Sequence, residues 1–528
     1  MLNSVKKECI AGVDIGGTSI KVLICDTQAH RIVLEKSPTL PAYIGTDGKT
    51  TDTGPQRRFD ANKLWAITAE TIRHAVSALP KDCVLRGISV SCCGCTVILL
   101  DEQDQQIDLH IEAGVREQEI LHYAGLYHDE EFSARTGYPL DKENSSFHLS
   151  AYCRQTIHNQ IAHVVNVDDY IAYRLCGELS RNYSTAVSCG MWDWKTNRWL
   201  PEFLSRTGLT AQIMGIPTDS GIPIGKVSAK ASKETGLPQD VLVSTGGHDY
   251  ECAAFACHSF VEGNLFNITG TIDMLASFDE EKLPANIQGC RHISDRHVIP
   301  GQRSCMMETP GAVQTEWLKN QIAANDTLGL TLSWEDFFQQ IAPLYADKLP
   351  RTELFIPKVF GTYIPRVDQH SFGMYCGLNK HTTAAALLLA TIEGMCFQLR
   401  KMICYMEDGH PPCKDMILAG GGSKDPTWLQ VKADILGMRL CIPDVEEASA
   451  LGAALLAGVG CGLYHSHQEA GRVTHNAEVR VIQPEPARTD YFKELYHEIY
   501  LPLEQCMDTF DKKIMKIKES RGNRYECN

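Results

Sequence analysis

Long apolar runs are scarce in this chain of 528 residues, of which 44% are hydrophobic and 22% are charged. The longest apolar stretch without a charge, residues 448–464, is interrupted by four glycines. It is shorter than the ~20 residues that a helix needs to cross a bilayer, so we expect a packed helix and no membrane partner. The first twelve residues lack the apolar core of a signal peptide, which favours a cytoplasmic location.

Positive charge is also in short supply, because 50 Lys and Arg residues stand against 65 Asp and Glu residues and the net charge is −15. A surface of this sign repels a phosphate backbone, and no basic stripe offsets it, so nucleic acid is not expected as a partner. The 21 cysteines are an odd number and cannot all pair. Reduced thiols in a reducing cytosol are the simpler interpretation.

Several catalytic and metal-binding motifs are absent. The chain contains no G-x-x-x-x-G-K-[ST] phosphate loop, no G-x-S-x-G nucleophile turn and no H-E-x-x-H helix. The cluster Cys92-Cys93-Gly94-Cys95 lacks a second ligand pair at zinc-finger spacing. Cys252, Cys257 and His258 are spaced for opposite faces of a helix. Both groups are therefore interpreted as buried thiols, not as metal centres.

What the sequence does contain is an α/β pattern that occurs twice. In the first half, β-branched runs at residues 10–13 and 20–25 flank a glycine turn. The pattern continues with an amphipathic helix at 64–76, strands at 88–90 and 96–100 and a helix at 164–177. The turn at residues 14–18 (Asp-Ile-Gly-Gly-Thr) has a looser copy at residues 267–271 (Asn-Ile-Thr-Gly-Thr), which predicts a duplicated domain. We therefore divide the chain into domains at residues 8–256 and 257–500 and a C-terminal helix and tail at 501–528.

The second half carries the order of elements that is typical of a nucleotide site. It reads as a helix at 383–405, a strand ending at Ala419, a glycine loop, and a helix at 426–436, followed by a strand at 439–442 and a helix at 448–457. The loop is Gly420-Gly421-Gly422-Ser423. A helix cap needs only one glycine, so three in succession favour a flat nucleoside lying against the backbone.

The first glycine turn is a candidate phosphate site. Glycines let backbone N–H groups approach an anion, hydroxyls add donors, and the carboxylate of Asp14 can hold a hydrated Mg²⁺. The alternative is a plain hairpin turn, which also favours adjacent glycines. The candidate residues are Asp14, Gly16, Gly17, Thr18, Ser19 and Lys21, with Gly270 and Thr271 as the matching loop of the second domain.

Asp249 is the candidate general base. It follows Gly246-Gly247-His248 at the end of an apolar strand, where a carboxylate can reach a substrate hydroxyl and accept its proton during phosphoryl transfer. The alternative is that Asp249 caps the apolar helix that follows. His248 either orients Asp249, touches substrate, or is structural.

Together these segments resemble the FGGY carbohydrate kinases, a family of the actin and sugar kinase superfamily, over residues 10–464. The most specific match is Gly420-Gly421-Gly422-Ser423-Lys424-x₃-Trp428-x-Gln430-x₂-Ala433-Asp434-x₂-Gly437, followed by Glu447-Ala448-x-Ala450-Leu451-Gly452. The Gly-His-Asp form of the catalytic segment is most similar to the fuculokinase and rhamnulokinase branches. The resemblance implies an α/β fold of two ribonuclease H-like domains that flank a central nucleotide and substrate cleft.

The resemblance also implies roles and partners. The γ-phosphoryl group of ATP is transferred to a hydroxyl of a small sugar, ketose or polyol. Asp249 matches the catalytic base, Asp14 the aspartate near Mg²⁺, and Gly421 to Ser423 the adenosine loop. A homodimer is expected from the family.

Three segments depart from the family pattern. The sugar-gripping segment Trp-x-Asp-x-Arg reads Glu112-Ala113-Gly114-Val115-Arg116, so only the arginine remains. Cys92 to Cys95 replace another substrate segment, and residues 361–365 replace Gly-Glu-Arg-x-Pro. The candidate substrate residues are Cys93, Gly94, Arg116, His248 and Asp249. These departures leave the acceptor open and motivate an alternative, a nucleotide-binding sensor or scaffold that has lost kinase activity; an actin-like filament former fits less well.

Overall fold

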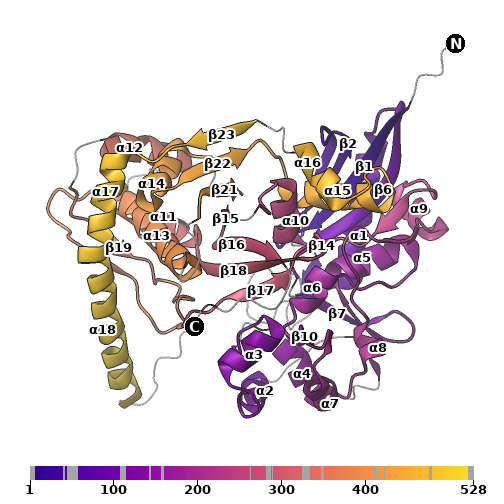
Figure 1. Cartoon of the computed structure of the whole chain (residues 1–528), viewed down its shortest axis with the longest axis horizontal. Helices are drawn as coiled ribbons and strands as arrows, with labels where there is room; N and C mark the ends of the chain where they lie inside the picture. Colours follow the sequence, from indigo (N-terminus) through magenta and orange to yellow (C-terminus); the bar gives the residue numbers. More distant parts are fainter. Residues whose placement is uncertain are drawn as a thin grey trace.

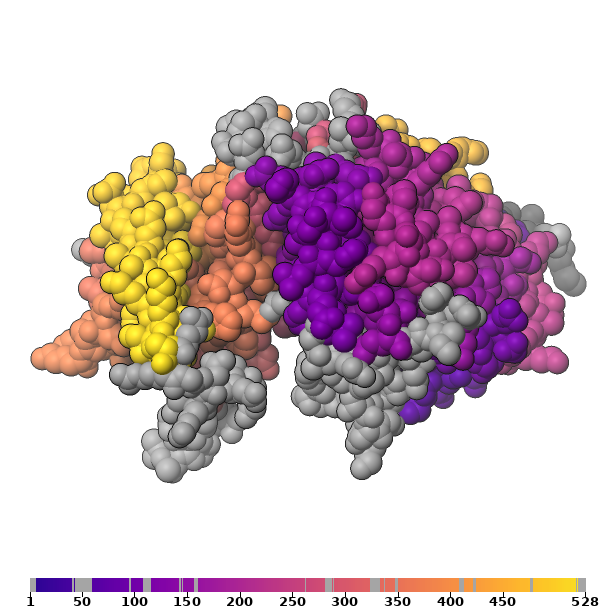
Figure 2. Space-filling view, turned by 90° about the horizontal axis from the view of Figure 1, so that it is seen from below, coloured from indigo at the N-terminus to yellow at the C-terminus, as the bar shows by residue number. Residues whose placement is uncertain are grey.

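The computed structural model describes residues 6–39, 42–44, 58–94, 96–107, 115–141, 144, 146–155, 160–261, 263–280, 287, 289–323, 333–346, 350–407, 413–420, 424–474 and 478–520. Two lobes lie side by side, one built mainly from the first half of the chain and one from the second half (Figure 1). Seen from below, the surface is hollowed between the orange and the purple parts of the chain (Figure 2).

The first lobe is built on a sheet with the N-terminal hairpin near its centre. β1 (Lys7–Ile15) pairs antiparallel with β2 (Ser19–Asp26) and parallel with β6 (Cys83–Cys92). The strand order is β12-β13-β6-β1-β2-β3, and β14 also pairs with β6. Residues 9–15 of β1 are all buried, as expected for a strand that is covered on both faces. The other strands of this sheet are β3 (Arg31–Pro38), β12 (Pro223–Lys226), β13 (Leu242–Ser244) and β14 (Gly247–His248).

The second lobe repeats this topology. β15 (Asn264–Thr269) pairs antiparallel with β16 (Ile272–Glu280) and parallel with β21 (Asp415–Ala419), within the order β17-β18-β16-β15-β21-β22-β23. β15, β16 and β18 therefore correspond to β1, β2 and β3, and β21 and β22 correspond to β6 and β13. This correspondence confirms the predicted α/β duplication. The remaining strands are β17 (Ile293–Arg296), β18 (Gln302–Pro310), β22 (Arg439–Pro443) and β23 (Val479–Ile482).

Two helices lie between the sheets and join the lobes. α10 (Asp249–Ala256) is buried from Tyr250 to Ala256, so every face of the helix is covered beyond its first residue. Its residues 252, 255 and 256 pack with α15 (Ala448–Gly460) and β1, while residues 250, 253 and 254 pack on the second sheet. α15 comes from the second half of the chain but packs on the first sheet, where a Cβ on Gly12 would lie 1.8 Å from the Ala450 carbonyl oxygen. The segment that carries Asp249 is therefore fixed by both lobes.

Other helices cover the outer faces of the sheets or form a helical insertion below the first lobe (Figure 1). The first sheet is covered by α1 (Ala61–Ser77), α5 (Val167–Cys176) and α9 (Ala229–Thr235). The insertion contains α2 (Val115–Ala124), α3 (Asp129–Thr136), α4 (Ser146–Gln155), α6 (Tyr183–Val187), α7 (Pro201–Thr207) and α8 (Ala211–Met214), with β7 (Val97–Leu100), β8 (Gln106–Ile107), β9 (His163–Asn166), β10 (Trp192–Asp193) and β11 (Arg198–Trp199). The second half adds α11 (Val313–Ala323), α12 (Trp334–Ala346), α13 (Ala384–Glu407), α14 (Pro426–Leu436), α16 (His467–Val473), α17 (Pro486–Leu495), a π-helical turn (Tyr496–Tyr500) and α18 (Leu501–Ser520). Short strand pairs complete the description: β4 (Tyr43–Ile44) with β5 (Arg58–Phe59), and β19 (Leu354–Ile356) with β20 (Met374–Cys376).

The predicted elements are confirmed with one notable exception. The helix expected at residues 164–177 begins only at Val167, because residues 163–166 form β9 and pair with β7. Gly177 ends that helix in a left-handed conformation, with φ of 84°. Within the described part of the chain, no helix is both long and apolar enough to span a bilayer, and no cysteine forms a disulfide.

Candidate active site

Asp14 lies at the end of β1, where the first hairpin turn begins. Its buried carboxylate accepts hydrogen bonds from the Ser91 hydroxyl and from the Lys21 ammonium group, each at 3.1 Å. Asp14 and Lys21 are direct partners in the β1–β2 register, which explains their contact. Burial raises the pKa of Asp14, while Lys21 and Ser91 oppose the rise. Lys21 is also paired with Glu447 at 3.2 Å, so its charge is already shared between two carboxylates.

The glycine turns of the two hairpins are built alike. The backbone N–H groups of Gly16 and Gly270 each donate within their own turn at 3.0 Å. The carbonyl oxygen of Gly16 accepts from the Thr39 hydroxyl, and that of Gly270 accepts from the Ala312 N–H, each at 2.8 Å. Thr39 follows β3 and Ala312 follows β18, which are corresponding strands of the two sheets. Each turn is therefore fixed by a hydrogen bond from the segment that follows β3 or β18.

The start of the predicted adenosine loop lies against the second glycine turn. Gly420 has a φ of 88°, and a Cβ there would lie 3.1 Å from the carbonyl oxygen of Thr269. A side chain at position 420 would therefore be both strained and crowded. Gly421, Gly422 and Ser423 lie outside the described residues, so their predicted role is not placed.

Lys432 ties the helix after that loop to the second glycine turn. It lies in α14, is fully buried, and donates from Nζ to Asn267 Oδ1 at 2.7 Å and to Thr269 Oγ1 at 2.6 Å. Thr269 immediately precedes the turn residues Gly270 and Thr271. A buried ammonium group is costly unless its protons are bonded, so these two contacts fix the geometry between helix and turn.

Gly246 and Gly247 bring Asp249 into place. A Cβ on Gly246 would lie 1.6 Å from the Val90 carbonyl oxygen of β6, and a Cβ on Gly247 would lie 2.4 Å from Val298 of the second lobe. Only a residue without a side chain permits so close an approach on both sides. The paired glycines therefore let this segment pass between the lobes and begin α10 at Asp249.

Asp249 is not the cap of its helix. The N-cap is His248, and Asp249 is the first helical residue, with Oδ1 accepting from the Tyr250 N–H at 2.8 Å. Burial raises the pKa of Asp249 to about 6; His248 opposes the rise, and Cys93 and Asp14 add to it. A carboxylate with a pKa near 6 is a stronger base than an ordinary aspartate and is still deprotonated at neutral pH.

His248 lies between two carboxylates. Nε2 is 3.6 Å from Asp249 Oδ1, and Nδ1 is 3.6 Å from Asp295 Oδ2 of β17. The exposed fractions of the side chains are 34% for Asp249, 8% for His248 and 0% for Asp295. The three side chains therefore extend from the space between the lobes into the interior. Burial lowers the pKa of His248, but Asp295, Cys93 and Asp249 outweigh it and hold the pKa well above the ordinary 6.5.

The predicted substrate residues fall into two groups. Gly94 lies against the imidazole, because a Cβ there would lie 2.8 Å from His248 Nδ1, and Cys93 interacts with the same ring. Arg116 is different: on α2, its described contacts are with His148 at 3.0 Å and Glu117 at 3.4 Å. The structure therefore brings Cys93, Gly94 and Asp249 together around His248, whereas Arg116 makes none of its described contacts with this group. Residues 112–114 lie outside the described residues.

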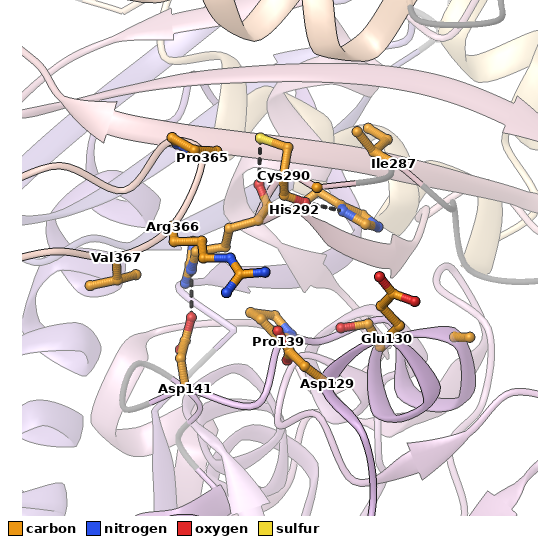
Figure 3. Close-up of a pocket in the computed structure, with 14 residues that line it drawn as sticks. Asp129, Glu130, Pro139, Asp141, Ile287, Cys290, His292, Pro365, Arg366 and Val367 are labelled. Carbon is orange, nitrogen blue, oxygen red and sulfur yellow. Dashed lines mark hydrogen bonds and ion pairs between the residues drawn. The ribbon is translucent and has the colours of Figure 1, made fainter. Parts of the chain in front are cut away.

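A separate cavity of about 220 Å³ lies between the helical insertion and the second lobe (Figure 3). Asp129 and Glu130 of α3 face it from one side and Arg366 from the other, while Arg291 is tied to Asp141 at 2.6 Å. None of the residues predicted from the sequence for nucleotide, base or acceptor lines this cavity.

Several residues of the site carried no recognisable sequence signal. Asp295 and Lys432 reach it from far along the chain, and Ser91 lies in an ordinary strand. Glu447 stood within a matched motif, yet only the fold reveals its pairs with Lys21 and Lys36.

The donors fit the nucleotide and metal that the resemblance implies. Carboxylate oxygen is a ligand that Mg²⁺ prefers, and Asp14 offers it beside a glycine turn of the kind that cradles phosphate. No cluster of three or more His, Cys, Asp or Glu residues suited to a metal occurs among the described residues.

Two similar α/β lobes, with a glycine turn in each and a carboxylate between them, define a two-lobed phosphotransferase of the actin and sugar kinase type. Family models for the FGGY family of carbohydrate kinases match residues 9–256 (N-terminal domain) and 269–461 (C-terminal domain). The chain therefore belongs to the FGGY family of carbohydrate kinases. It is a carbohydrate kinase, with ATP as its phosphate donor.

Similar proteins agree with this assignment. Autoinducer-2 kinase of Escherichia coli K12 is 25% identical over an alignment of 518 residues that covers 93% of this chain and 93% of the relative. Xylulose kinase of Bacillus subtilis is 25% identical over 337 residues, covering 63% of this chain and 65% of the relative. In fold, a xylulose kinase from Rhodospirillum rubrum has a TM-score of 0.81 at 21% identity, covering 96% of this chain and all of that one. A gluconate kinase from Lactobacillus acidophilus has a TM-score of 0.83 at 17% identity, with the same coverage.

Proposed function

We propose that the chain transfers the γ-phosphoryl group of ATP to a hydroxyl of a small sugar, ketose or polyol, with Asp249 as the general base. The observation that carries this proposal is the position of Asp249: at the start of α10, between the lobes, with a pKa of about 6 and Asp14 near enough to influence it. Relatives named for autoinducer-2 and xylulose support a small polyhydroxylated acceptor.

In this reaction the deprotonated Asp249 accepts the proton of the acceptor hydroxyl. The hydroxyl oxygen forms a bond to the γ-phosphorus as the bond to the ADP oxygen breaks. Such a transfer requires positioning and charge neutralisation more than covalent help from the protein. The glycine turns at 16–19 and 270–271 supply N–H groups for the phosphates, and the loop at 420–423 supplies the adenosine surface.

Further parts of the proposal follow the same reasoning. Asp14 would hold Mg²⁺ through water, and the bound ion would neutralise phosphate charge. Cys93, Gly94, His248 and Arg116 are proposed for the acceptor side of the site. The domain limits 8–256, 257–500 and 501–528, a homodimer and a cytoplasmic location are proposed with the family as support.

The variant Asp249→Asn tests the base. The expected result is a fall in kcat of about 10² to 10⁴, since this is the range that general base catalysis supplies, with ATP binding retained. Release of ADP is measured with a panel of ketopentoses, deoxyketoses, tetritols and hexonates, and ATP binding by calorimetry. Glu251→Gln is the matched control, a carboxylate two residues further along the same helix whose side chain is fully buried. Full activity of Asp249→Asn would refute the role of Asp249, and ATP binding without any acceptor would favour the sensor alternative.

A further inference from the structure

The second lobe contributes a buried carboxylate to the neighbourhood of the base. Asp295, in β17, has no solvent-exposed side-chain surface. Its Oδ1 accepts from the Tyr138 hydroxyl at 2.8 Å, and its Oδ2 accepts from the Tyr250 hydroxyl at 3.1 Å. Two short hydroxyl donors provide the compensation that a buried carboxylate requires.

The same carboxylate faces His248. The distance from Asp295 Oδ2 to His248 Nδ1 is 3.6 Å, and the other ring nitrogen is 3.6 Å from the carboxylate of Asp249. An imidazolium carries two N–H groups and can face a carboxylate on each side, whereas a neutral imidazole has one N–H. The spacing therefore suits a protonated His248 between two aspartates.

The ring of His248 has little freedom to turn away. The space beside it is closed by Gly94, where even a Cβ would lie 2.8 Å from the ring, and the Tyr250 ring packs edge-on at 4.5 Å between centroids. The backbone N–H of His248 donates to the Ser184 hydroxyl at 2.9 Å. The titratable groups that act on the ring are Asp295 from β17, Asp249, Tyr250 and Glu251 from α10, and Cys93 from the segment after β6.

The ring of His248 lies between Asp295 and Asp249, 3.6 Å from each carboxylate. The groups that most strongly influence the Asp249 carboxylate are His248, Cys93 and Asp14. The residue before Asp295 is fixed where the lobes meet, because the Ser294 N–H donates to the Gly137 carbonyl oxygen at 2.7 Å. A Cβ on Gly137 would lie 2.2 Å from the Ser294 carbonyl oxygen, so these two backbones are in direct contact beside Asp295.

We propose that Asp295 is a positioning residue for the catalytic base: from the second lobe it holds His248, in its cationic form, against Asp249 of the first. The inference rests on the proposed role of Asp249. With Asp295 in this role, the base strength of Asp249 depends on the position of the second lobe relative to the first. A change in the contact between β17 and the insertion at residues 137–138 would change the charge beside the base.

The decisive experiment is a titration of His248 that needs no acceptor. The full chain is labelled with ¹³C-histidine, and the His248 resonance is identified by its absence in His248→Gln. Asp295→Asn, which keeps the shape and one acceptor oxygen for the tyrosine hydroxyls but removes the charge, is expected to lower the pKa of His248 by one unit or more. Asp279→Asn, an exposed carboxylate of β16 that is paired with Arg303 at 3.0 Å, is expected to shift it by less than 0.3 unit. An unchanged pKa of His248 in Asp295→Asn would overturn the proposal.

A double-mutant cycle of kcat/KM, measured with an acceptor identified in the panel, distinguishes a positioning role of Asp295 from an effect on stability alone. In Asp295→Asn and in His248→Gln, the acidic limb of kcat/KM is expected to move to higher pH by at least half a unit, because Asp249 loses its cationic neighbour. The double variant is expected to show no further shift. A loss of activity with an unmoved limb, or additive shifts in the double variant, would overturn the role of Asp295. If no acceptor is found, the proposed function fails, while the imidazole titration still decides the role of Asp295.

Discussion

At the scale of single residues, the pKa of Asp249 near 6 predicts how activity responds to pH. The base works only when deprotonated, so kcat/KM is expected to fall tenfold per unit below about pH 6 and to be level above it. The measurement is kcat/KM from pH 5 to 8 at constant ionic strength.

ATP titrates in the same range, so a control must separate the two. His248→Gln removes the neighbouring cation and is expected to move the limb upward, whereas the titration of ATP is the same for both enzymes. A profile that is flat down to pH 5, or a limb at one pH in both enzymes, would contradict the assignment to Asp249.

Lys432 offers a second prediction at this scale. Lys432→Met keeps much of the length of the side chain but leaves Asn267 and Thr269 without their ammonium donor. A hydrogen bond to a charged group contributes about 1.5–3 kcal/mol, so we expect the KM for ATP to rise about tenfold or more. Lys414→Met is the control, because Lys414 is exposed at the start of β21. An unchanged KM for ATP in Lys432→Met would show that the second glycine turn does not depend on this contact.

At the scale of elements, the crossing of α10 and α15 holds the base in position. A Cβ on Gly452 of α15 would lie 2.0 Å from the Cys252 carbonyl oxygen of α10, so Gly452→Ala must push the two helices apart. Overpacking of this kind costs about 1–3 kcal/mol, and here it also moves the helix that carries Asp249. We expect a lower melting temperature and a lower kcat.

Gly301→Ala is the matched control for the loss of a glycine. Gly301 has a φ of 80° and nothing within 4 Å of a built Cβ, so its variant bears only the strain of a left-handed alanine, about 1 kcal/mol. Equal stability and equal activity of the two variants would mean that the α10–α15 contact is not tight.

The sequence predicts an element well when the pattern is local, and poorly when contacts with distant segments decide the structure. The hairpins and the helix at 426–436 are local patterns, and the structure places them as expected. The start of the helix at Val167 was missed because Val164 and Val165 fit a strand and a helix equally well, and only pairing with β7 decides. Periodicity marked α15 as buried, but it cannot tell which sheet the helix packs on.

The candidate site divides in the same way. Asp14 and Asp249 stand beside glycines that indicate a turn, so the sequence alone made them candidates. Asp295 is 46 residues beyond Asp249, in a strand with no motif, and it matters only because β17 lies beside α10. Lys432 likewise lies 163 and 165 residues along the chain from its partners Thr269 and Asn267. Residues that support the site from another lobe leave no local trace in the sequence.

At the scale of the whole molecule, the contact between the lobes contains a second buried acid. Glu251 of α10 accepts a hydrogen bond from Ser304 of β18, and its Oε2 lies 3.2 Å from His297 Nε2. Burial raises the pKa of Glu251 to about 8 and lowers the pKa of His297 to about 3, so both groups are neutral at pH 7. The Ile299 N–H donates to Nδ1 of His297, which leaves Nε2 to carry the proton toward Glu251.

These shifts predict a pH-dependent stability with a definite sign. Between the ordinary Glu pKa of 4.5 and the folded value of about 8, the folded protein binds a proton at Glu251 that the unfolded chain releases, so stability falls as pH rises. His297 acts in the opposite sense between about 3 and 6.5, and the two contributions offset each other from about pH 4.5 to 6.5. Above pH 6.5 the effect of Glu251 remains alone.

Glu251→Gln isolates this contribution, because glutamine resembles the protonated acid at every pH. Relative to the parent protein, the variant is expected to gain about 3–4 kcal/mol of stability between pH 5 and pH 8, since one pKa unit is worth about 1.36 kcal/mol. Melting temperatures of the two proteins, measured at half-unit steps, should therefore diverge in favour of the variant as pH rises. Asp279→Asn, at an exposed ion pair with Arg303 at 3.0 Å, serves as the control and should run parallel to the parent. Parallel curves for Glu251→Gln as well would mean that Glu251 is ionised between the lobes and is stabilised there by His297.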